Sequence, residues 1–309
     1  MPELPEVEVV RAGLDPAVTG ATVLGVKVLD ERALTRYAGS GSQFEAALTG
    51  RVLVGAARRG KFLWIPLQPV DPQGAGAGEA LVAHLGMSGQ LLLRSPGAGT
   101  ERHERIRFEI QHPGHGDLAI VFADQRTFGS LTLDPLVPTP DAAPGGCGTR
   151  DASVPGQVAH IARDPLDPAF SDRRFRDAVG RKGSAIKRVL LDQTTISGVG
   201  NIYADEALWR ARIHPEIPSR TLSTRAVNRL LADVRGVLDQ ALAEGGTSFD
   251  AQYVNVNGQA GYFAHSLNAY GRGGLPCPRC GSTMVREPWA NRSSTRCPRC
   301  QRRPRGLAV

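Results

Sequence analysis

Apolar and polar residues alternate over several short stretches between residues 21 and 133, and turn-forming residues separate these stretches. A period of two places the apolar side chains on one face of a β-strand. Eight strands are expected, at residues 23–29, 51–57, 61–67, 81–85, 90–94, 105–111, 117–122 and 128–133. Their spacing predicts a β-sandwich or barrel with the first helix packed against it.

Beyond Ser171 the apolar period becomes helical. Helices are expected at residues 172–179, 185–191, 201–211 and about 224–243, with Ser184 as the N-cap of the second. The segment between the two patterns is rich in proline and glycine, so it is interpreted as an interdomain connection. It contains Cys147, which is expected to be a free thiol without a structural role.

The first helix is expected to begin within the opening octet, Met-Pro-Glu-Leu-Pro-Glu-Val-Glu. Pro5 suits the first position of a helix, and it disfavours helical angles at Leu4. Val7, Val10 and Leu14 follow three and four residues apart, which gives this helix an apolar stripe.

The same octet contains a candidate nucleophile. If Met1 is removed, Pro2 presents a free secondary amine, and an α-amino group titrates near pH 8, about two units below lysine. The positive end of the helix dipole should lower this pKa further. Such an amine can attack carbon with Glu3 beside it as a proton donor. The alternative is an ordinary exposed terminus with an acidic first helical turn.

The length of 309 residues and the hydrophobic content of 41% suit two domains and a small appendage. The first ten residues contain three glutamates and no basic residue, and no apolar run approaches the roughly 18 residues of a membrane span. We therefore expect a cytoplasmic protein that is neither secreted nor inserted into a membrane.

Positive charge is concentrated at the C-terminal end. Residues 271–309 contain nine arginines, no lysine and one acid, Glu287. The net charge of this stretch is +8, so the total of +7 leaves −1 for residues 1–270. A basic terminal module suggests a polyanionic partner such as nucleic acid.

Four cysteines lie among these arginines in two Cys-Pro-Arg-Cys pairs separated by sixteen residues. The pairs are Cys277 with Cys280 and Cys297 with Cys300. This spacing is typical of a zinc ribbon, in which four thiolates bind one structural Zn²⁺. An iron–sulfur cluster or two disulfides are the alternatives.

A glycine-containing turn joins two of the expected helices and ends at Asn201. Gly198 and Gly200 allow close backbone approach, and the free N–H groups at the start of the second helix could bind a DNA phosphate. The alternative is that Asn201 is only a helix cap. The segment 245–263 contains glycine, asparagine and aromatic residues, so it is either a mobile lid or a long ordered hairpin.

Two further turns contain candidate contact residues. Met87 lies between glycines in the segment from His84 to Gly89, and Arg126 and Phe128 lie at a strand junction. Methionine usually fills a core, but a turn position weakens that interpretation.

Five separated segments together resemble bacterial formamidopyrimidine-DNA glycosylases of the Fpg/Nei family. They are Pro2 to Glu8, Lys61 with the preceding Arg58-Arg59-Gly60, His84 to Gly89, the segment around Asn201, and the cysteine ribbon with Asn291-Arg292-Ser293. The segments occur in the order typical of the family, and the resemblance runs from Pro2 to about Arg303.

The resemblance implies a bifunctional base-excision repair enzyme that removes oxidised purines, notably 8-oxoguanine and formamidopyrimidines, from duplex DNA. Pro2 would attack C1′ of the damaged nucleotide, and Glu3 would assist opening of the deoxyribose ring. The resulting Schiff base would permit β- and δ-elimination. Glu6 corresponds to another active-site residue, and Lys61 to a group that holds the lesion or its phosphates.

The resemblance also assigns DNA contacts. His84 and Lys187 correspond to lesion or phosphate contacts, and Asn201 and Arg292 to phosphate contacts near a kink. Met87, Arg126 and Phe128 correspond to residues that fill the space left by the extruded base, with Arg126 reading the opposite cytosine. Many relatives have an arginine where this chain has Thr127. Leu4, Met87 and Phe128 favour the purine branch over the endonuclease VIII branch.

The fold expected from pattern and resemblance is α+β and multidomain. Its parts are a catalytic β-sandwich with a flanking helix (1–134), a linker (135–170), a helix–two-turn–helix domain with a loop at 245–263 that closes over the base (171–270), a zinc finger hairpin (271–303) and a tail (304–309). The expected cofactor is one structural Zn²⁺. The expected partner of this monomer is double-stranded DNA with oxidised bases or abasic sites, which would associate the protein with the nucleoid.

Overall fold

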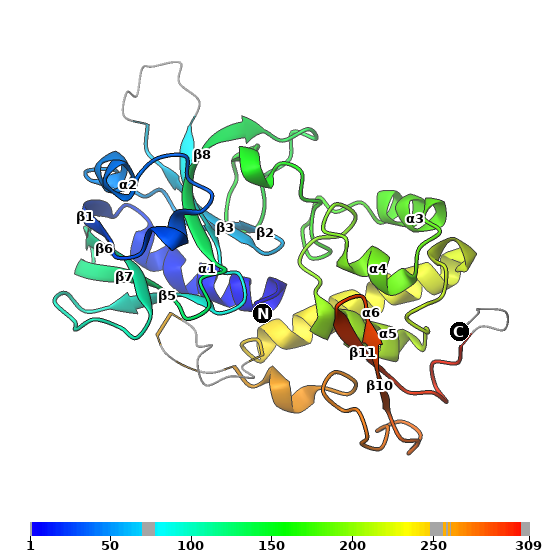
Figure 1. The fold of residues 1–309 in the computed structure, drawn as a ribbon. Coiled ribbons are helices and arrows are strands. Elements are labelled where there is room, and N and C mark those ends of the chain that lie inside the picture. Colours follow the sequence, from blue (N-terminus) through cyan, green and yellow to red (C-terminus); the bar gives the residue numbers. More distant parts are fainter. Residues whose placement is uncertain (1, 70–77, 248–255, 258, 260, 304–309) are drawn as a thin grey trace. The chain divides into compact units, whose positions relative to one another are not determined.

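The computed structural model describes residues 2–69, 78–247, 256–257, 259 and 261–303 (Figure 1). The chain forms two compact units. The N-terminal unit comprises Met1–His160 and Gly245–Gly261, and the C-terminal unit comprises Ile161–Glu244 and Tyr262–Val309. The chain therefore passes between the units three times.

The N-terminal unit is a β-sandwich, as expected from the sequence. Its first sheet has the strand order β1-β6-β7-β5 and its second the order β2-β3-β4-β8-β9, with antiparallel neighbours throughout. The strands are β1 (Thr22–Val28), β2 (Ala57–Arg59), β3 (Phe62–Leu67), β4 (Glu79–His84), β5 (Gly89–Arg94), β6 (Glu104–His112), β7 (Gly116–Asp124), β8 (Ser130–Pro138) and β9 (Ser153–Pro155).

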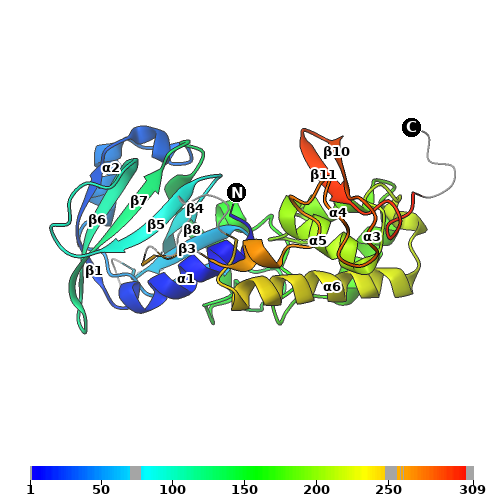
Figure 2. The ribbon, with the colours of Figure 1, turned by 90° about the horizontal axis from the view of Figure 1, so that it is seen from below.

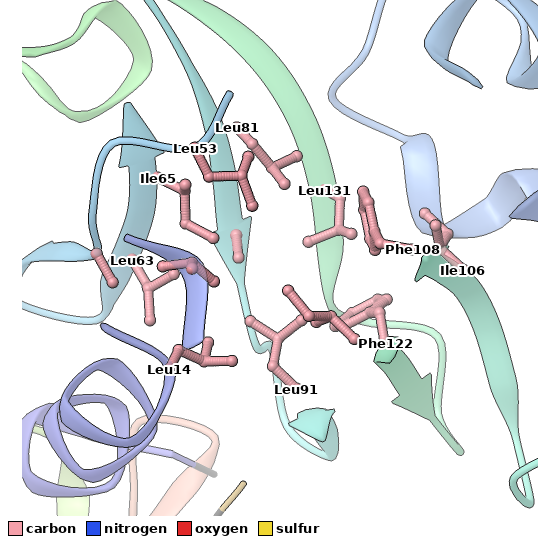
Figure 3. Packing of buried hydrophobic residues seen from close by; sticks show 14 of the residues in the cluster. Leu14, Leu53, Leu63, Ile65, Leu81, Leu91, Ile106, Phe108, Phe122 and Leu131 are labelled. Atoms are coloured by element: carbon pink, nitrogen blue, oxygen red, sulfur yellow. The ribbon is translucent and has the colours of Figure 1, made fainter. Parts of the chain in front are cut away.

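The core of this unit lies between its two sheets. Leucine and isoleucine side chains of β3, β4 and β8 face Leu91, Phe108 and Phe122 of the opposite sheet (Figure 3). Leu14 of the first helix closes one side of this core. Burial of such side chains stabilises the fold by roughly 1.5–3 kcal/mol each.

Helix α1 (Leu4–Val18) packs on this core, and Figure 2 shows it beneath the strands. Val7, Val10 and Leu14 are buried, which confirms the apolar stripe. The helix begins one residue earlier than expected: Leu4 already has helical geometry, and Pro5 occupies the second position. The bias that proline imposes on its predecessor is outweighed here by the complete burial of Leu4.

The expected strand at 51–57 is wrong. Val52 pairs with Thr22 of β1, whereas Leu53 pairs with Leu67 of β3, so successive residues bond to different sheets. This segment is a corner between the sheets and not a strand. A short helix that the pattern did not predict, α2 (Gly41–Leu48), precedes it, with a capping box between Ser40 and Gln43.

The C-terminal unit is mainly helical. Its elements are α3 (Asp172–Arg181), α4 (Ile186–Leu191), α5 (Asn201–Ala211), α6 (Thr224–Ala243) and the hairpin β10 (Val285–Trp289) and β11 (Arg292–Arg296), with short 3₁₀ turns at 219–221 and 263–266. Two more 3₁₀ turns, at 31–34 and 156–158, lie in the N-terminal unit. Within the described residues no helix combines the length and the apolar character needed to cross a membrane.

Ser184 is not the N-cap of α4. The N-cap is Ala185, whose side chain cannot accept a hydrogen bond. The peptide N–H groups of Ile186 and Lys187 donate instead to the carbonyls of Ile217 (2.9 Å) and Pro215 (3.1 Å). Backbone from the loop after α5 therefore satisfies donors that a capping side chain usually satisfies.

Candidate active site and nucleic-acid interface

The start of α1 carries two buried carboxylates, Glu3 and Glu6. The peptide N–H of Glu3 donates to Glu6 Oε2 at 2.8 Å. Glu6 Oε1 accepts both the peptide N–H and the hydroxyl of Thr247, each at 2.8 Å. Pro2, adjacent to this network, is also buried. Residues 2–7 of the octet are all buried, so the alternative of an ordinary exposed terminus does not hold for the part of the octet that the structure describes.

Thr247 was not identified from the sequence. It follows α6 in the chain, yet it belongs to the N-terminal unit, and its two hydrogen bonds join residues 241 positions apart. The sequence pattern indicates only the segment 245–263 that contains Thr247, and it does not distinguish Thr247 from its neighbours. Most of that segment, residues 248–255 with 258 and 260, lies outside the described residues, so the expectation of a lid is not addressed.

Lys61 and Gly60 form the turn between β2 and β3, in which Gly60 has a positive φ of 56°. Arg58, in the middle of the preceding strand β2, is almost completely buried. Its Nε donates to Glu8 Oε2 at 2.8 Å, and its Nη1 donates to the Gly60 carbonyl at 3.2 Å. Arg58 thus connects the helix that begins at Leu4 with the turn that presents Lys61. Two residues of the basic cluster at 58–61, Arg58 and Arg59, are therefore buried and do not form a solvated charged face.

His84 ends β4 and is half-buried against Phe62, with ring centroids 4.8 Å apart. Burial, together with the positive charges of Arg36 and Lys61, lowers the pKa of His84 to about 4. Its Nδ1 accepts the peptide N–H of Gly86 at 3.2 Å. The imidazole is therefore neutral near pH 7 with its proton on Nε2, so it offers one hydrogen-bond donor and no charge.

Met87, Arg126 and Phe128 lie in two loops of the N-terminal unit, after β4 and after β7. All three side chains are exposed, Phe128 by 59% and Met87 by 40%. The guanidinium carbon of Arg126 lies 5.4 Å from the centre of the Phe128 ring. An exposed methionine and phenylalanine beside an arginine suit contact with stacked bases.

In the C-terminal unit, Asn201 is the first residue of α5, and Gly200 is its N-cap. The interpretation of Asn201 as only a cap is therefore wrong. Its Nδ2 donates to the carbonyl of Ser293 at 3.0 Å. Arg292, next to Ser293 at the start of β11, is exposed.

Lys187 donates to the same Ser293 carbonyl at 3.1 Å and forms an ion pair with Asp205 at 2.7 Å. The side chain of Lys187 is fully buried, and its ammonium lies 5.0 Å from the centre of the Trp289 ring. A buried ammonium with these partners does not reach a DNA phosphate directly. Lys187 and Asn201 both donate to the Ser293 carbonyl and thereby connect α4 and α5 to the hairpin that carries Arg292.

The four ribbon cysteines lie together in this unit. Their Sγ atoms all lie within 4.8 Å of one another, and no disulfide joins them. Four thiolates around one Zn²⁺, each about 2.3 Å from the metal, require mutual sulfur distances of just under 4 Å. The residues therefore fit a tetrahedral zinc site, and the two-disulfide alternative is not supported. Cys147 lies far away in the sequence and is exposed.

The fold and the site place the chain in the class of helix–two-turn–helix proteins that combine a β-sandwich with a four-cysteine hairpin. The family model for the formamidopyrimidine-DNA glycosylase N-terminal domain matches residues 1–131, and the model for the H2TH domain of the same enzymes matches residues 161–252. The chain belongs to the formamidopyrimidine-DNA glycosylase family.

Curated relatives agree with this assignment over their full length. The formamidopyrimidine-DNA glycosylase of Leifsonia xyli is 61% identical over 98% of this chain and 100% of its own. That of Streptomyces avermitilis is 52% identical, with 99% of each chain covered. Among solved structures, Lactococcus lactis Fpg in complex with DNA containing an abasic site has a TM-score of 0.77 and 28% identity, over 97% of this chain and 100% of that one.

Proposed function

We propose that this protein is a bifunctional DNA glycosylase and AP lyase of base-excision repair that removes oxidised purines from duplex DNA. The observation that carries this proposal is the buried carboxylate pair, Glu3 and Glu6, at the start of α1 and next to Pro2. Family membership supplies the substrate class. The solved relatives include Lactococcus lactis complexes with Fapy-dG DNA and with abasic-site DNA.

In the proposed reaction, the amine of Pro2, free after removal of Met1, attacks C1′ of the damaged nucleotide. The N-glycosidic bond breaks, its electron pair leaves with the base, and the proton lost from the Pro2 nitrogen neutralises the departing base. Glu3 donates a proton to the ring oxygen of the deoxyribose, so the ring opens and a Schiff base forms between Pro2 and C1′. Loss of the protons at C2′ and C4′ then allows β- and δ-elimination of the two flanking phosphates.

The hydrogen bonds separate the roles of the two glutamates. Glu6 accepts from the Glu3 peptide N–H and twice from Thr247, so these hydrogen bonds fix the orientation of its carboxylate. Glu6 is therefore the orienting group. Glu3 is the residue whose carboxyl we assign to proton transfer.

The damaged base must leave the stack before Pro2 reaches its sugar, at a cost of a few kcal/mol. We assign Met87, Arg126 and Phe128 to the vacated space, and Lys61 and His84 to the lesion or its phosphates. Asn201 and Arg292 are assigned to phosphates near the kink, with Lys187 acting through the Ser293 carbonyl. Zinc, when bound, supplies structure only, because four thiolates leave no position for a substrate.

Borohydride reduction in the presence of 8-oxoguanine duplex tests the proposal. A covalent adduct is expected with protein whose first residue is confirmed as Pro2. Glu3→Gln should lose base excision and retain DNA binding, whereas Pro2→Gly should retain some trapping because its amine is also N-terminal. Absence of an adduct, or full excision by Glu3→Gln, would contradict the proposed mechanism.

Two alternatives have different outcomes in the same assay. A non-catalytic zinc-ribbon protein that recognises damaged DNA would bind the duplex without forming an adduct. A pyrimidine-specific enzyme would cleave thymine-glycol duplex faster than 8-oxoguanine duplex. One solved Lactococcus lactis complex does contain an oxidised pyrimidine, so both duplexes belong in the comparison.

A further inference from the structure

The carboxylate of Asp124, the last residue of β7, lies between two loops that carry proposed DNA contacts. Asp124 is 1% exposed. Its Oδ1 accepts the Ser88 hydroxyl at 2.5 Å and the Arg126 peptide N–H at 3.1 Å. Its Oδ2 accepts the Gly129 peptide N–H at 2.7 Å. One carboxylate therefore bonds to the loop of Met87 and to both ends of the loop of Phe128.

Ser88 reinforces this connection. Its Oγ donates to Asp124 and also accepts the Arg126 peptide N–H at 3.1 Å. The serine that follows Met87 thus contacts the peptide group that presents Arg126.

The two loops also touch through their backbones. A Cβ atom on Gly86 would lie 2.4 Å from the Phe128 carbonyl carbon and 2.5 Å from the Gly129 nitrogen. Only glycine permits this approach, and Gly86 has a positive φ of 60°. The two backbones are therefore in close contact at Gly86, where any side chain would force them apart.

The second loop has a strained conformation that this network maintains. Thr127 has a φ of 54°, in the left-handed region that β-branched residues rarely adopt. Such a conformation persists only where the surroundings determine it. Asp124 accepts hydrogen bonds from the peptide N–H groups of residues 126 and 129, on either side of Thr127, and these bonds hold Thr127 in this conformation.

We propose that Asp124 and Ser88 are positioning residues that couple the two loops, so that filling the vacated space and reading the opposite base occur as one event. The inference rests on the proposed function, because it presumes that Met87, Arg126 and Phe128 contact DNA. Its consequence is that selectivity for cytosine opposite the lesion depends on a buried carboxylate and a partly buried hydroxyl that touch no base.

Substitutions at these positions can separate coupling from folding. Asp124→Asn keeps the shape of the side chain but replaces one acceptor oxygen with an NH₂ group, which must then face an N–H or O–H donor. Ser88→Ala removes the link between the loops and leaves the bonds of Asp124 to Arg126 and Gly129. Ser88→Thr restores the hydroxyl. Asp117→Asn, at the exposed other end of β7, is the matched control.

The test is the ratio of excision rates for 8-oxoguanine opposite cytosine and opposite adenine. A good base contact gives a discrimination of about tenfold or more. We expect Asp124→Asn and Ser88→Ala to lower the wild-type ratio about tenfold or more. Ser88→Thr and Asp117→Asn should keep the ratio. Borohydride trapping on a preformed abasic site, together with thermal unfolding, reports whether each variant remains folded and reactive.

A second readout does not require catalysis. The fluorescence of 2-aminopurine opposite a tetrahydrofuran abasic analogue reports insertion of side chains into the duplex. The inference predicts a smaller change with Ser88→Ala than with wild type at equal saturation. If Ser88→Ala and Asp124→Asn lower excision equally opposite both bases and leave the fluorescence change intact, the coupling role is overturned. If wild type itself forms no adduct, the proposed function fails, and the fluorescence comparison still decides the coupling.

Discussion

The ammonium of Lys187 lies 2.7 Å from the carboxylate of Asp205, and neither side chain is more than 1% exposed. Asp205 also accepts the Ser294 hydroxyl at 3.0 Å and the Thr295 peptide N–H at 2.9 Å. The pair therefore joins α4, α5 and β11 in the C-terminal unit. Burial raises the pKa of Asp205, and the charge of Lys187 opposes that effect.

Lys187→Met should destabilise the C-terminal unit by about 3–5 kcal/mol, because it leaves a buried carboxylate without its counter-charge. Without the lysine, the folded-state pKa of Asp205 rises further above its unfolded value. The free energy of unfolding of this variant should then fall as pH rises above the unfolded pKa. Urea unfolding at pH 5 and pH 8 checks both statements. A Lys187→Met, Asp205→Leu double variant that is no more stable than the single variant would contradict them.

Salt dependence should distinguish His84 from the charged DNA contacts. Because the pKa of His84 is about 4, the ring carries no charge at pH 7 and releases no counterion. Lys61→Met and Arg292→Met should each lower the slope of log K against log salt concentration by about one. His84→Gln should weaken binding without changing that slope. A changed slope for His84→Gln at pH 7 would show that the imidazole is charged.

Removal of one ribbon cysteine should remove the metal. Cys280→Ser lacks one thiolate of the tetrahedral set, and the hairpin that presents Arg292 should then lose its order. We expect about one zinc per wild-type chain by mass spectrometry, and less metal and much weaker DNA binding for Cys280→Ser. Cys147→Ser is the control. A wild-type chain that contains iron instead of zinc would favour the cluster alternative.

The contact of Arg58 with Glu8 should affect both stability and reactivity. Burial raises the pKa of Glu8, but the hydrogen bonds and charges of Arg11 and Arg58 lower it overall. The stability due to Glu8 is thus present above its unfolded pKa and is lost as pH falls. Arg58→Met should cost about 1.5–3 kcal/mol at pH 7. It should also slow borohydride trapping, because the turn that contains Lys61 loses the hydrogen bond from Arg58 to the Gly60 carbonyl. Glu79→Gln, whose carboxylate pairs with Arg51 near the surface, should change neither strongly.

Much of the fold could be predicted from local pattern. The apolar stripe of α1, the alternation in β6 and the boundaries of α5 and α6 follow from the spacing of apolar residues, which depends only on neighbouring positions. The corner at Val52 and Leu53 and the capping of α4 by backbone carbonyls could not be predicted in this way. Both depend on partners that are distant in the sequence.

In the candidate site, too, only residues marked by a local motif or by the resemblance could be predicted from the sequence. Motif spacing identified the cysteine cluster, and resemblance identified Glu3 and Lys61. Asp124, Ser88 and Thr247 were missed, because an isolated aspartate, serine or threonine has no periodicity that marks it. The resemblance assigns Lys187 to a lesion or phosphate contact, but its burial against Asp205 cannot be inferred from the sequence.

The three passages of the chain between its two units have a consequence for limited proteolysis. A single cut in the connection before Ile161 leaves only residues 245–261 of the N-terminal unit covalently attached to the C-terminal unit. A second cut among residues 248–255 would still leave Thr247 attached to α6 while its hydrogen bonds to Glu6 persist. All strands of the sandwich lie within residues 22–155, so the cut before Ile161 already separates them covalently from the C-terminal unit, and release of the sandwich then requires rupture of those hydrogen bonds.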